Sequence, residues 1–162
     1  MAKSVNISRS LFFSERTIIG IIIIFSIVLY GNTLKNGYNL DDELVTISHR
    51  LTSKGIEAIP EIFSSPYYSD EMGYRYEYRP VVLATFAIEH SLFGENPQIS
   101  HFINLLLYIL SCLLVFKLSQ MLWKNNLFFP FVVTLLFVVC PLHTEAVSSI
   151  KNRDEVISLL GG

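Results

Sequence analysis

The chain has 162 residues, of which 51% are hydrophobic and 16% are charged, and its mean hydropathy is +0.46. A soluble domain normally carries about 25% charged residues, and the apolar residues here gather in blocks, so the composition favours a multi-pass membrane protein. The net charge of −2 gives no reason to expect nucleic acid as a partner. Cys112 and Cys140 lie in apolar runs without the spacing of a zinc site.

The first apolar run is uncharged from residue 17 to residue 34 and follows a basic segment with Lys3, Arg9 and Arg16. Eighteen helical residues span about 27 Å, close to the hydrocarbon thickness of a bilayer. A cleaved signal peptide is the alternative, but no small-residue cleavage site follows Tyr30. We therefore predict an uncleaved first span with the N-terminus in the cytoplasm, by the positive-inside rule.

Residues 35–97 form a long, acid-rich segment that this topology places outside. Near its start, Asp41 is expected to cap a short helix, and a second short helix is expected over residues 56–63. Residues 67–80 hold five of the eight tyrosines, which indicates either an aromatic belt at the membrane surface or a surface on which a sugar stacks. The apolar band after Pro80 predicts an interfacial helix.

Two further apolar runs predict spans over residues 101–123 and 127–142, the second ending near Pro141. The apolar run that resumes at residue 156 reads as the start of a fourth span. The predicted fold class is therefore all-α, a multi-pass transmembrane helical bundle with short interfacial helices in a long first outside loop. We expect residues 1–162 to be the N-terminal part of a longer membrane domain.

This topology places two polar segments on the same outer side of the membrane. The first is the acidic run, and the second follows Pro141 and carries His143, Glu145, Lys151, Arg153 and Asp154. Basic residues on the outside oppose the positive-inside preference. Either Lys151 and Arg153 balance neighbouring acids, or Arg153 binds a phosphate, for which a guanidinium is well suited.

The acidic run of Asp41, Asp42 and Glu43 also has two interpretations. Acids in a first helical turn stabilise the helix through its dipole. Carboxylates this close to a bilayer also suit a reaction site, since their burial in lipid would be costly. The position of the run beside the first span, together with the family resemblance described below, favours a functional role. His143 and Glu145 carry the same ambiguity, since either can cap the helix after Pro141.

Several motifs together resemble the start of a membrane glycosyltransferase of the GT-C type. These are Asn36-Gly37-Tyr38-x-x-Asp41-Asp42, Tyr78-Arg79-Pro80, Phe86-Ala87-Ile88-Glu89-His90, His101-Phe102-x-Asn104-Leu105 and Pro141-Leu142-His143-Thr144-Glu145-Ala146-Val147. The chain is most similar to the tetratricopeptide-repeat protein O-mannosyltransferases and their bacterial relatives.

The resemblance implies transfer of a sugar, typically mannose, from a polyprenyl-phosphate carrier to an acceptor hydroxyl on a protein or glycan. It places the catalytic carboxylate on Asp41 or Asp42. Substrate-binding candidates are Glu43, Arg79, His143, Glu145, Arg153 and Asp154. The departing phosphate needs a cation, either one of these side chains or a divalent metal. The expected location is the bacterial inner membrane or the endoplasmic reticulum.

Two other functions compete with this hypothesis. A non-catalytic membrane anchor or assembly subunit could keep the same fold without turnover. A transporter would bind cations with the acids, but it predicts charges within the spans, and residues 17–34 contain none. We also expect the 162-residue chain alone to be inactive, because three spans cannot enclose a lipid carrier.

Overall fold

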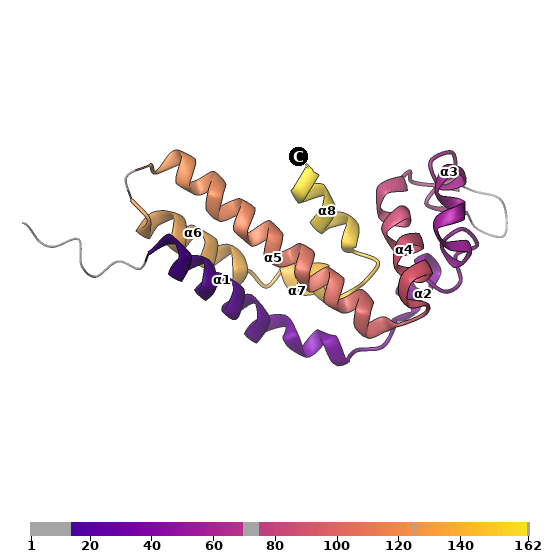
Figure 1. Cartoon of the computed structure of the whole chain (residues 1–162), viewed down its shortest axis with the longest axis horizontal. Helices are drawn as coiled ribbons and strands as arrows, with labels where there is room; N and C mark the ends of the chain where they lie inside the picture. The colour runs from indigo at the N-terminus through magenta and orange to yellow at the C-terminus, as the bar shows by residue number, and fades with distance from the viewer. Residues whose placement is uncertain (1–13, 70–74, 125, 162) are drawn as a thin grey trace, which may run out of the picture.

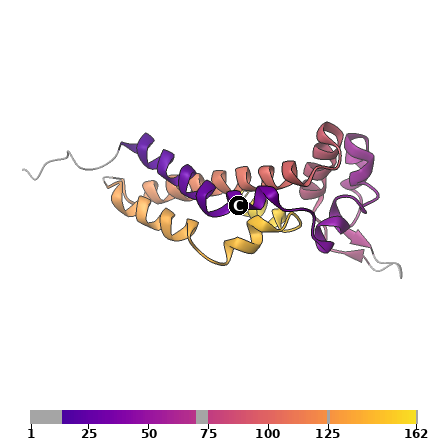
Figure 2. The same ribbon diagram turned by 90° about the horizontal axis from the view of Figure 1, so that it is seen from below.

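A computed structural model describes residues 14–69, 75–124 and 126–161. Helices α1, α5 and α6 lie alongside one another, and the shorter helices α2, α3 and α4 gather at one end of them (Figures 1 and 2). Two short strands, β1 (Tyr68–Ser69) and β2 (Arg75–Tyr76), pair antiparallel at that end. Lys3 and Arg9 of the basic N-terminal flank used to predict orientation lie outside the described residues, as does part of the tyrosine-rich segment, 70–74.

Helix α1 (Glu15–Tyr30) begins where Ser14 accepts a hydrogen bond from the backbone N–H of Thr17, at 3.3 Å. It continues as a 3-10 helix, η1 (Gly31–Lys35). Together they form a helix long and apolar enough to cross a membrane, as the first uncharged run predicts. Helix α5 (Pro97–Leu122) is the second such helix within the described residues. It begins four residues before the predicted start because Asn96 caps it, accepting from the N–H of Ile99 at 3.2 Å.

The third apolar run forms a shorter helix than predicted, α6 (Phe128–Val138). Eleven helical residues span about 16 Å, roughly half the thickness of a bilayer core. The predicted end at residue 142 was wrong, because Pro141 cannot donate a helical hydrogen bond. The hydroxyls of Tyr30 and Tyr108 both donate to the Val138 carbonyl at 3.1 Å, which satisfies this helix end. Helices α7 (His143–Ser148) and α8 (Arg153–Gly161) follow.

The core of the bundle uses one face of α1, where buried residues recur every four positions. Ile18, Ile22 and Tyr30 pack with Tyr108 and apolar residues of α5 and α6. The hydroxyl of Ser26 on the same face is buried but donates to the Ile22 carbonyl at 2.9 Å. Ile24 and its neighbours on the opposite face remain exposed. This arrangement leaves an apolar outer surface, as expected for helices that contact lipid.

The long loop folds into α2 (Leu40–Val45), the 3-10 helix η2 (Thr52–Ala58), α3 (Ile59–Ile62) and α4 (Pro80–Phe93). These elements have a separate apolar core, with one contribution from beyond α7: Val45, Leu51, Ala58, Ile62, Tyr67, Val82, Leu83, Phe86, Ala87 and Ile150. The predicted helix after Pro80 is present and crosses the direction of α5 (Figure 1). Its placement at a membrane surface stays a prediction.

Helix η2 approaches α4 closely at Gly55. This residue has a φ of 72°, and an added Cβ would lie 2.1 Å from the Ser91 hydroxyl oxygen. The same hydroxyl accepts the N–H of Ile56 at 2.8 Å. Glycine is therefore needed at position 55 for two reasons. The backbone is in the left-handed region, and a side chain would prevent the close contact with Ser91. The contact fixes η2 against α4.

Candidate functional site

The three consecutive acids occupy different environments on α2. Asp42 is fully buried, whereas Asp41 and Glu43 are exposed. Successive residues on a helix point about 100° apart, so one acid can face the protein while its neighbours face solvent. The N-cap of α2 is Asn39. The prediction that Asp41 caps this helix was therefore wrong by two residues, and Asp41 lies in the first turn instead.

Asp42 joins α2 to the segment after α7. One carboxylate oxygen, Oδ2, accepts the backbone N–H of Asn39 at 3.0 Å. The other, Oδ1, accepts the Ser149 hydroxyl at 3.2 Å and the backbone N–H of Lys151 at 2.8 Å. Both oxygens are thus used within the protein. The helix-capping interpretation of the acidic run applies to Asp42.

Asp41 is the acid of the pair that solvent can reach. Its side chain is 65% exposed, and the Lys151 ammonium lies 3.2 Å from its Oδ2. An open depression of about 660 Å³ adjoins it, lined by Tyr38, Asn39, Asp41, Glu145, Ser148 and Ser149. Burial raises the pKa of Tyr38 above its ordinary value, so its phenol stays a neutral hydroxyl. The structure thus brings Asp41 of the first loop together with Glu145 of the segment after Pro141.

Arg153 is fully buried and faces away from this depression. Its guanidinium donates to Glu89 Oε2 at 2.9 Å, to Asn104 Oδ1 at 2.6 Å and to the Ser100 carbonyl at 3.2 Å. It also lies 4.2 Å from the centre of the Phe86 ring. A phosphate contact would require this side chain to leave the core. The charge-balance interpretation of Arg153 fits this geometry, with Glu89 as the balancing acid.

Arg79 and Asp154 form an ion pair with each other. Arg79 also contacts Glu77 at 2.7 Å and lies over the Tyr67 ring at 5.3 Å. Its side chain is 34% exposed, so it retains access to solvent. Neither Arg79 nor Asp154 lines the depression. The pair connects the start of α4 to the start of α8.

His143 and Glu43 also lie outside the lining of the depression. The His143 Nδ1 lies 3.2 Å from the Tyr108 hydroxyl, and its ring centre lies 4.3 Å from that of Phe137. His143 therefore packs against the end of the bundle rather than capping α7. Glu43 is exposed on α2.

Sequence reasoning missed several residues that shape the site. Tyr38, Asn39, Ser148 and Ser149 line the depression, and no chemical signal in the sequence separates them from other loop residues. Glu89 did carry a signal, because it interrupts the apolar band of α4. An acid at that position in an otherwise buried helix face predicts a buried partner.

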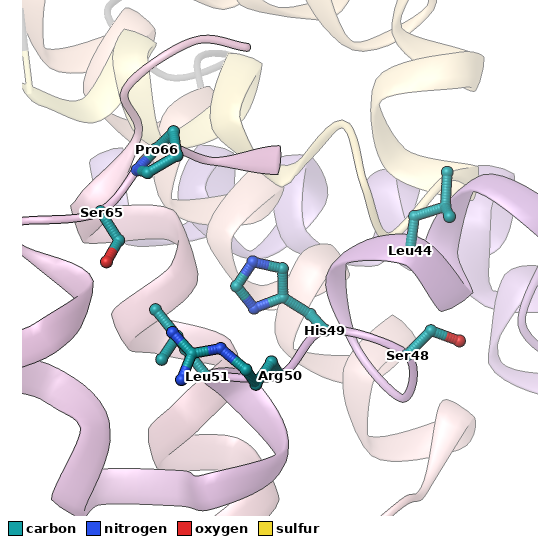
Figure 3. A pocket seen from close by; sticks show the side chains of 7 residues that line it. All are labelled: Leu44, Ser48, His49, Arg50, Leu51, Ser65 and Pro66. Carbon is teal, nitrogen blue, oxygen red and sulfur yellow. The ribbon is translucent and has the colours of Figure 1, made fainter. Parts of the chain in front are cut away.

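A second cavity of about 420 Å³ lies beyond the other end of α2. The His49 ring points into it, with Leu44 and Ser48 on one side and Ser65 and Pro66 on the other (Figure 3). His49 Nδ1 accepts the backbone N–H of Thr52 at 3.3 Å, so its Nε2 carries the proton donated to the Tyr67 carbonyl at 3.1 Å. Burial lowers the pKa of His49, consistent with this neutral ring.

The described residues do not form a complete set of metal ligands. Within residues 14–69, 75–124 and 126–161, no three His, Cys, Asp or Glu side chains converge as a metal site requires. Asp41 and Glu145 supply two carboxylates to the depression. A divalent cation there would need further oxygen ligands, such as a substrate phosphate.

Several known proteins that share one description are similar in sequence to this chain. The chain is 31% identical to "Protein O-mannosyl-transferase TMTC1" of Homo sapiens over 139 residues, which cover 83% of this chain and 16% of that protein. It is 29% identical to TMTC2 of Homo sapiens and 28% identical to F38B6.6 of Caenorhabditis elegans, which carry the same description. This chain is a homologue of protein O-mannosyl-transferases.

The O-mannosyl-transferase relationship predicted from the motifs is thus confirmed. The chain spans about one sixth of the length of TMTC1 and TMTC2, at 16% of each. No family model and no solved structure matches it. The GT-C fold, the tetratricopeptide repeats and the lipid-phosphate donor therefore stay predictions.

Proposed function

We propose that this chain is the N-terminal part of a membrane glycosyltransferase that transfers mannose to an acceptor hydroxyl, with Asp41 as the general base. The observation that carries the proposal is the position of Asp41, exposed at the rim of the depression only a few residues after a membrane-length helix. The names of the O-mannosyl-transferase relatives support the sugar and the reaction type.

The donor in this proposal is a polyprenyl-phosphate-linked sugar, and the acceptor is a protein or glycan hydroxyl. Such a donor carries an activated leaving group, so the enzyme mainly needs a base for the acceptor and a cation for the phosphate. Asp41 accepts the acceptor proton as the hydroxyl oxygen forms the bond to the anomeric carbon. The carrier phosphate leaves with the electrons of the broken glycosidic bond.

Lys151 is the cation that we assign to the departing phosphate. Its ammonium pairs with Asp41 and is 36% exposed, whereas Arg153 is enclosed by protein. The Asp41–Lys151 pair can open to place a cation on the phosphate and leave Asp41 free to act as base. Arg79, whose side chain is 34% exposed, is another cation with access to solvent.

The topology belongs to the same proposal: cytoplasmic N-terminus, and the 35–97 loop on the outer side. Ser64 is exposed in that loop and suits a cysteine label. With Cys112 and Cys140 replaced by alanine, Ser64→Cys should react with a membrane-impermeant maleimide from the outer side only. Labelling solely from the cytoplasmic side would contradict the topology.

Replacement of Asp41 in the full-length protein tests the activity. Loss of a general base lowers rates about 10²- to 10⁴-fold, so Asp41→Asn should insert normally yet lose mannose transfer from a polyprenyl-phosphate donor. Glu57→Gln, at an exposed acid on η2, serves as the control. Near-normal transfer by Asp41→Asn would overturn the proposal. The 162-residue chain alone should show no transfer.

A further inference from the structure

Asn104 lies about two turns after the start of α5 and is fully buried. Its amide uses both ends in tertiary contacts: Nδ2 donates to the Ser149 carbonyl at 3.2 Å, and Oδ1 accepts from Arg153 Nε at 2.6 Å. The carbonyl can only accept and the guanidinium can only donate, which fixes the orientation of the amide. Asn104 thereby holds both ends of the segment 149–153.

The Arg153 side of this contact is itself anchored. Arg153 pairs with Glu89 of α4, a carboxylate only 7% exposed, and donates to the Ser100 carbonyl of α5 and to the Thr85 hydroxyl of α4 at 3.2 Å each. Buried charges that keep several partners resist displacement, because losing one partner leaves an uncompensated charge. The segment that begins α8 is therefore fixed to α4 and α5.

The Ser149 side leads to the acids. The Ser149 carbonyl accepts a hydrogen bond from the Asn104 amide, and the Ser149 hydroxyl donates one to the Asp42 carboxylate. The same carboxylate also accepts a hydrogen bond from the backbone N–H of Lys151. Asp42 in turn closes the first turn of α2 on Asn39. Hydrogen bonds thus run without a break from Glu89 through Arg153, Asn104 and Ser149 to Asp42. We call these five side chains the Asn104 network.

We propose that Asn104 is a positioning residue for Asp41, acting through Ser149 and Asp42. Asp41 directly precedes Asp42 in the first turn of α2, and its partner Lys151 belongs to the segment that Asn104 holds. Asn104 does not line the depression, so it orders the acid and its cation without touching substrate. The catalytic consequence rests on the proposed function of Asp41, whereas the ordering of the segment does not.

Asn104→Asp separates the two contacts of the amide. An aspartate keeps an acceptor for Arg153 but replaces the donor that faces the Ser149 carbonyl with a second acceptor. Ser149→Ala is a milder companion that removes only the hydroxyl bonded to Asp42. Ser111→Ala is the matched control, since this buried hydroxyl of α5 bonds to Leu107 within the same helix.

The experiment uses the full-length protein and measures mannose transfer from a polyprenyl-phosphate donor together with amide hydrogen exchange. Misplacement of a reacting group by about 1 Å can cost roughly 10²-fold in rate. We expect Asn104→Asp to lower kcat about 10- to 100-fold with little change in the donor KM, and to speed exchange over residues 149–152. Asn104→Asp and Ser149→Ala both act through Ser149. The variant that combines them should therefore have a kcat little lower than that of Asn104→Asp alone.

Unchanged kcat and unchanged exchange over 149–152 in Asn104→Asp would overturn the inference. If Asn104→Asp also speeds exchange throughout α1, it has unfolded globally, and Ser149→Ala then decides: a lower kcat with local exchange supports the inference, and wild-type behaviour overturns it. Retained activity in Asp41→Asn would instead refute the proposed function, while the exchange data would still test the Asn104 network.

Discussion

The bundle of α1, α5 and α6 and the region built from α2, α4 and residues 149–154 are stabilised by different interactions. In the bundle, apolar faces meet, and buried hydroxyls such as Ser26 bond within their own helix. In the second region, an apolar core is supplemented by a buried ion pair and a chain of tertiary hydrogen bonds that hold helices together. The bundle can therefore tolerate changes in polar detail, whereas the second region depends on each polar partner.

The proposed site lies in the region where the positions of individual atoms are most tightly specified. Apolar packing fixes which faces meet but permits small shifts, and a network of directional bonds fixes individual atoms. Asp41 and Lys151 lie in the region of directional bonds. The four predictions below test this contrast, from the largest expected effect to the smallest.

The largest effect is expected at the buried ion pair. Arg153→Met would leave the Glu89 carboxylate buried without its cation, which typically costs about 3–5 kcal/mol. The free energy of unfolding in detergent should fall by that amount. Adding Glu89→Leu should restore most of it.

An exposed ion pair in the bundle supplies the control for that comparison. Lys117 and Glu15 pair across α5 and α1 with side chains 57% and 44% exposed. Lys117→Met should cost no more than about 1 kcal/mol. Similar losses for Lys117→Met and Arg153→Met would contradict the distinction between the two regions.

Apolar packing in the bundle is tested at Ile22, which is fully buried. Ile22→Ala should leave a cavity and cost about 2–4 kcal/mol in the free energy of unfolding. Ile24→Ala, two residues away and 64% exposed, should cost less than 1 kcal/mol. Equal effects in thermal unfolding would mean that the face of α1 has been assigned incorrectly.

Removing the hydroxyls that bond to the Val138 carbonyl tests how the bundle tolerates the loss of a buried hydrogen bond. Tyr30→Phe or Tyr108→Phe alone should cost about 1 kcal/mol, because the other hydroxyl still satisfies the carbonyl. The double variant should cost more than the sum, since it leaves a buried carbonyl unpaired. Strict additivity in a double-mutant cycle would rule out a shared acceptor.

The smallest effect is a pH dependence at His49. Burial lowers the pKa of His49 in the folded protein below the ordinary value of about 6.5. The unfolded chain therefore takes up a proton more readily as the pH falls below about 6.5, so folded stability decreases there. His49→Gln should reduce this decrease between pH 7.5 and pH 5. An unchanged pH profile in His49→Gln would disprove the linkage.

The sequence predicted the long helices well because their signal is local. The uncharged run at 17–34 became α1 and η1, and the run at 101–123 became most of α5. It overestimated α6, because apolar composition alone does not register that Pro141 and the two tyrosines end the helix at Val138. Hydropathy indicates where apolar residues lie, but it does not indicate where the backbone hydrogen bonds of a helix end.

The candidate site was predicted only in outline. Asp41 and Glu145 do share a depression, as the topology suggested. The sequence could not separate Asp41 from Asp42, because two adjacent aspartates have the same chemistry until tertiary contacts bury one of them. It also left open whether Arg153 balances an acid or binds a phosphate, because its partner Glu89 lies 64 positions away and no periodicity connects them.

The contacts of Asp42 also constrain how the protein is made. Its partners Ser149 and Lys151 lie 107 and 109 positions later in the chain, so at ordinary synthesis rates α2 waits about 5–20 s before they leave the ribosome. During that interval Asp42 has only its local partner, the backbone N–H of Asn39. The contacts that join α2 to residues 149–151 therefore form late, after α5 and α6 have been synthesised, so a folding defect in α5 or α6 should leave Asp42 without these partners even with every acid intact.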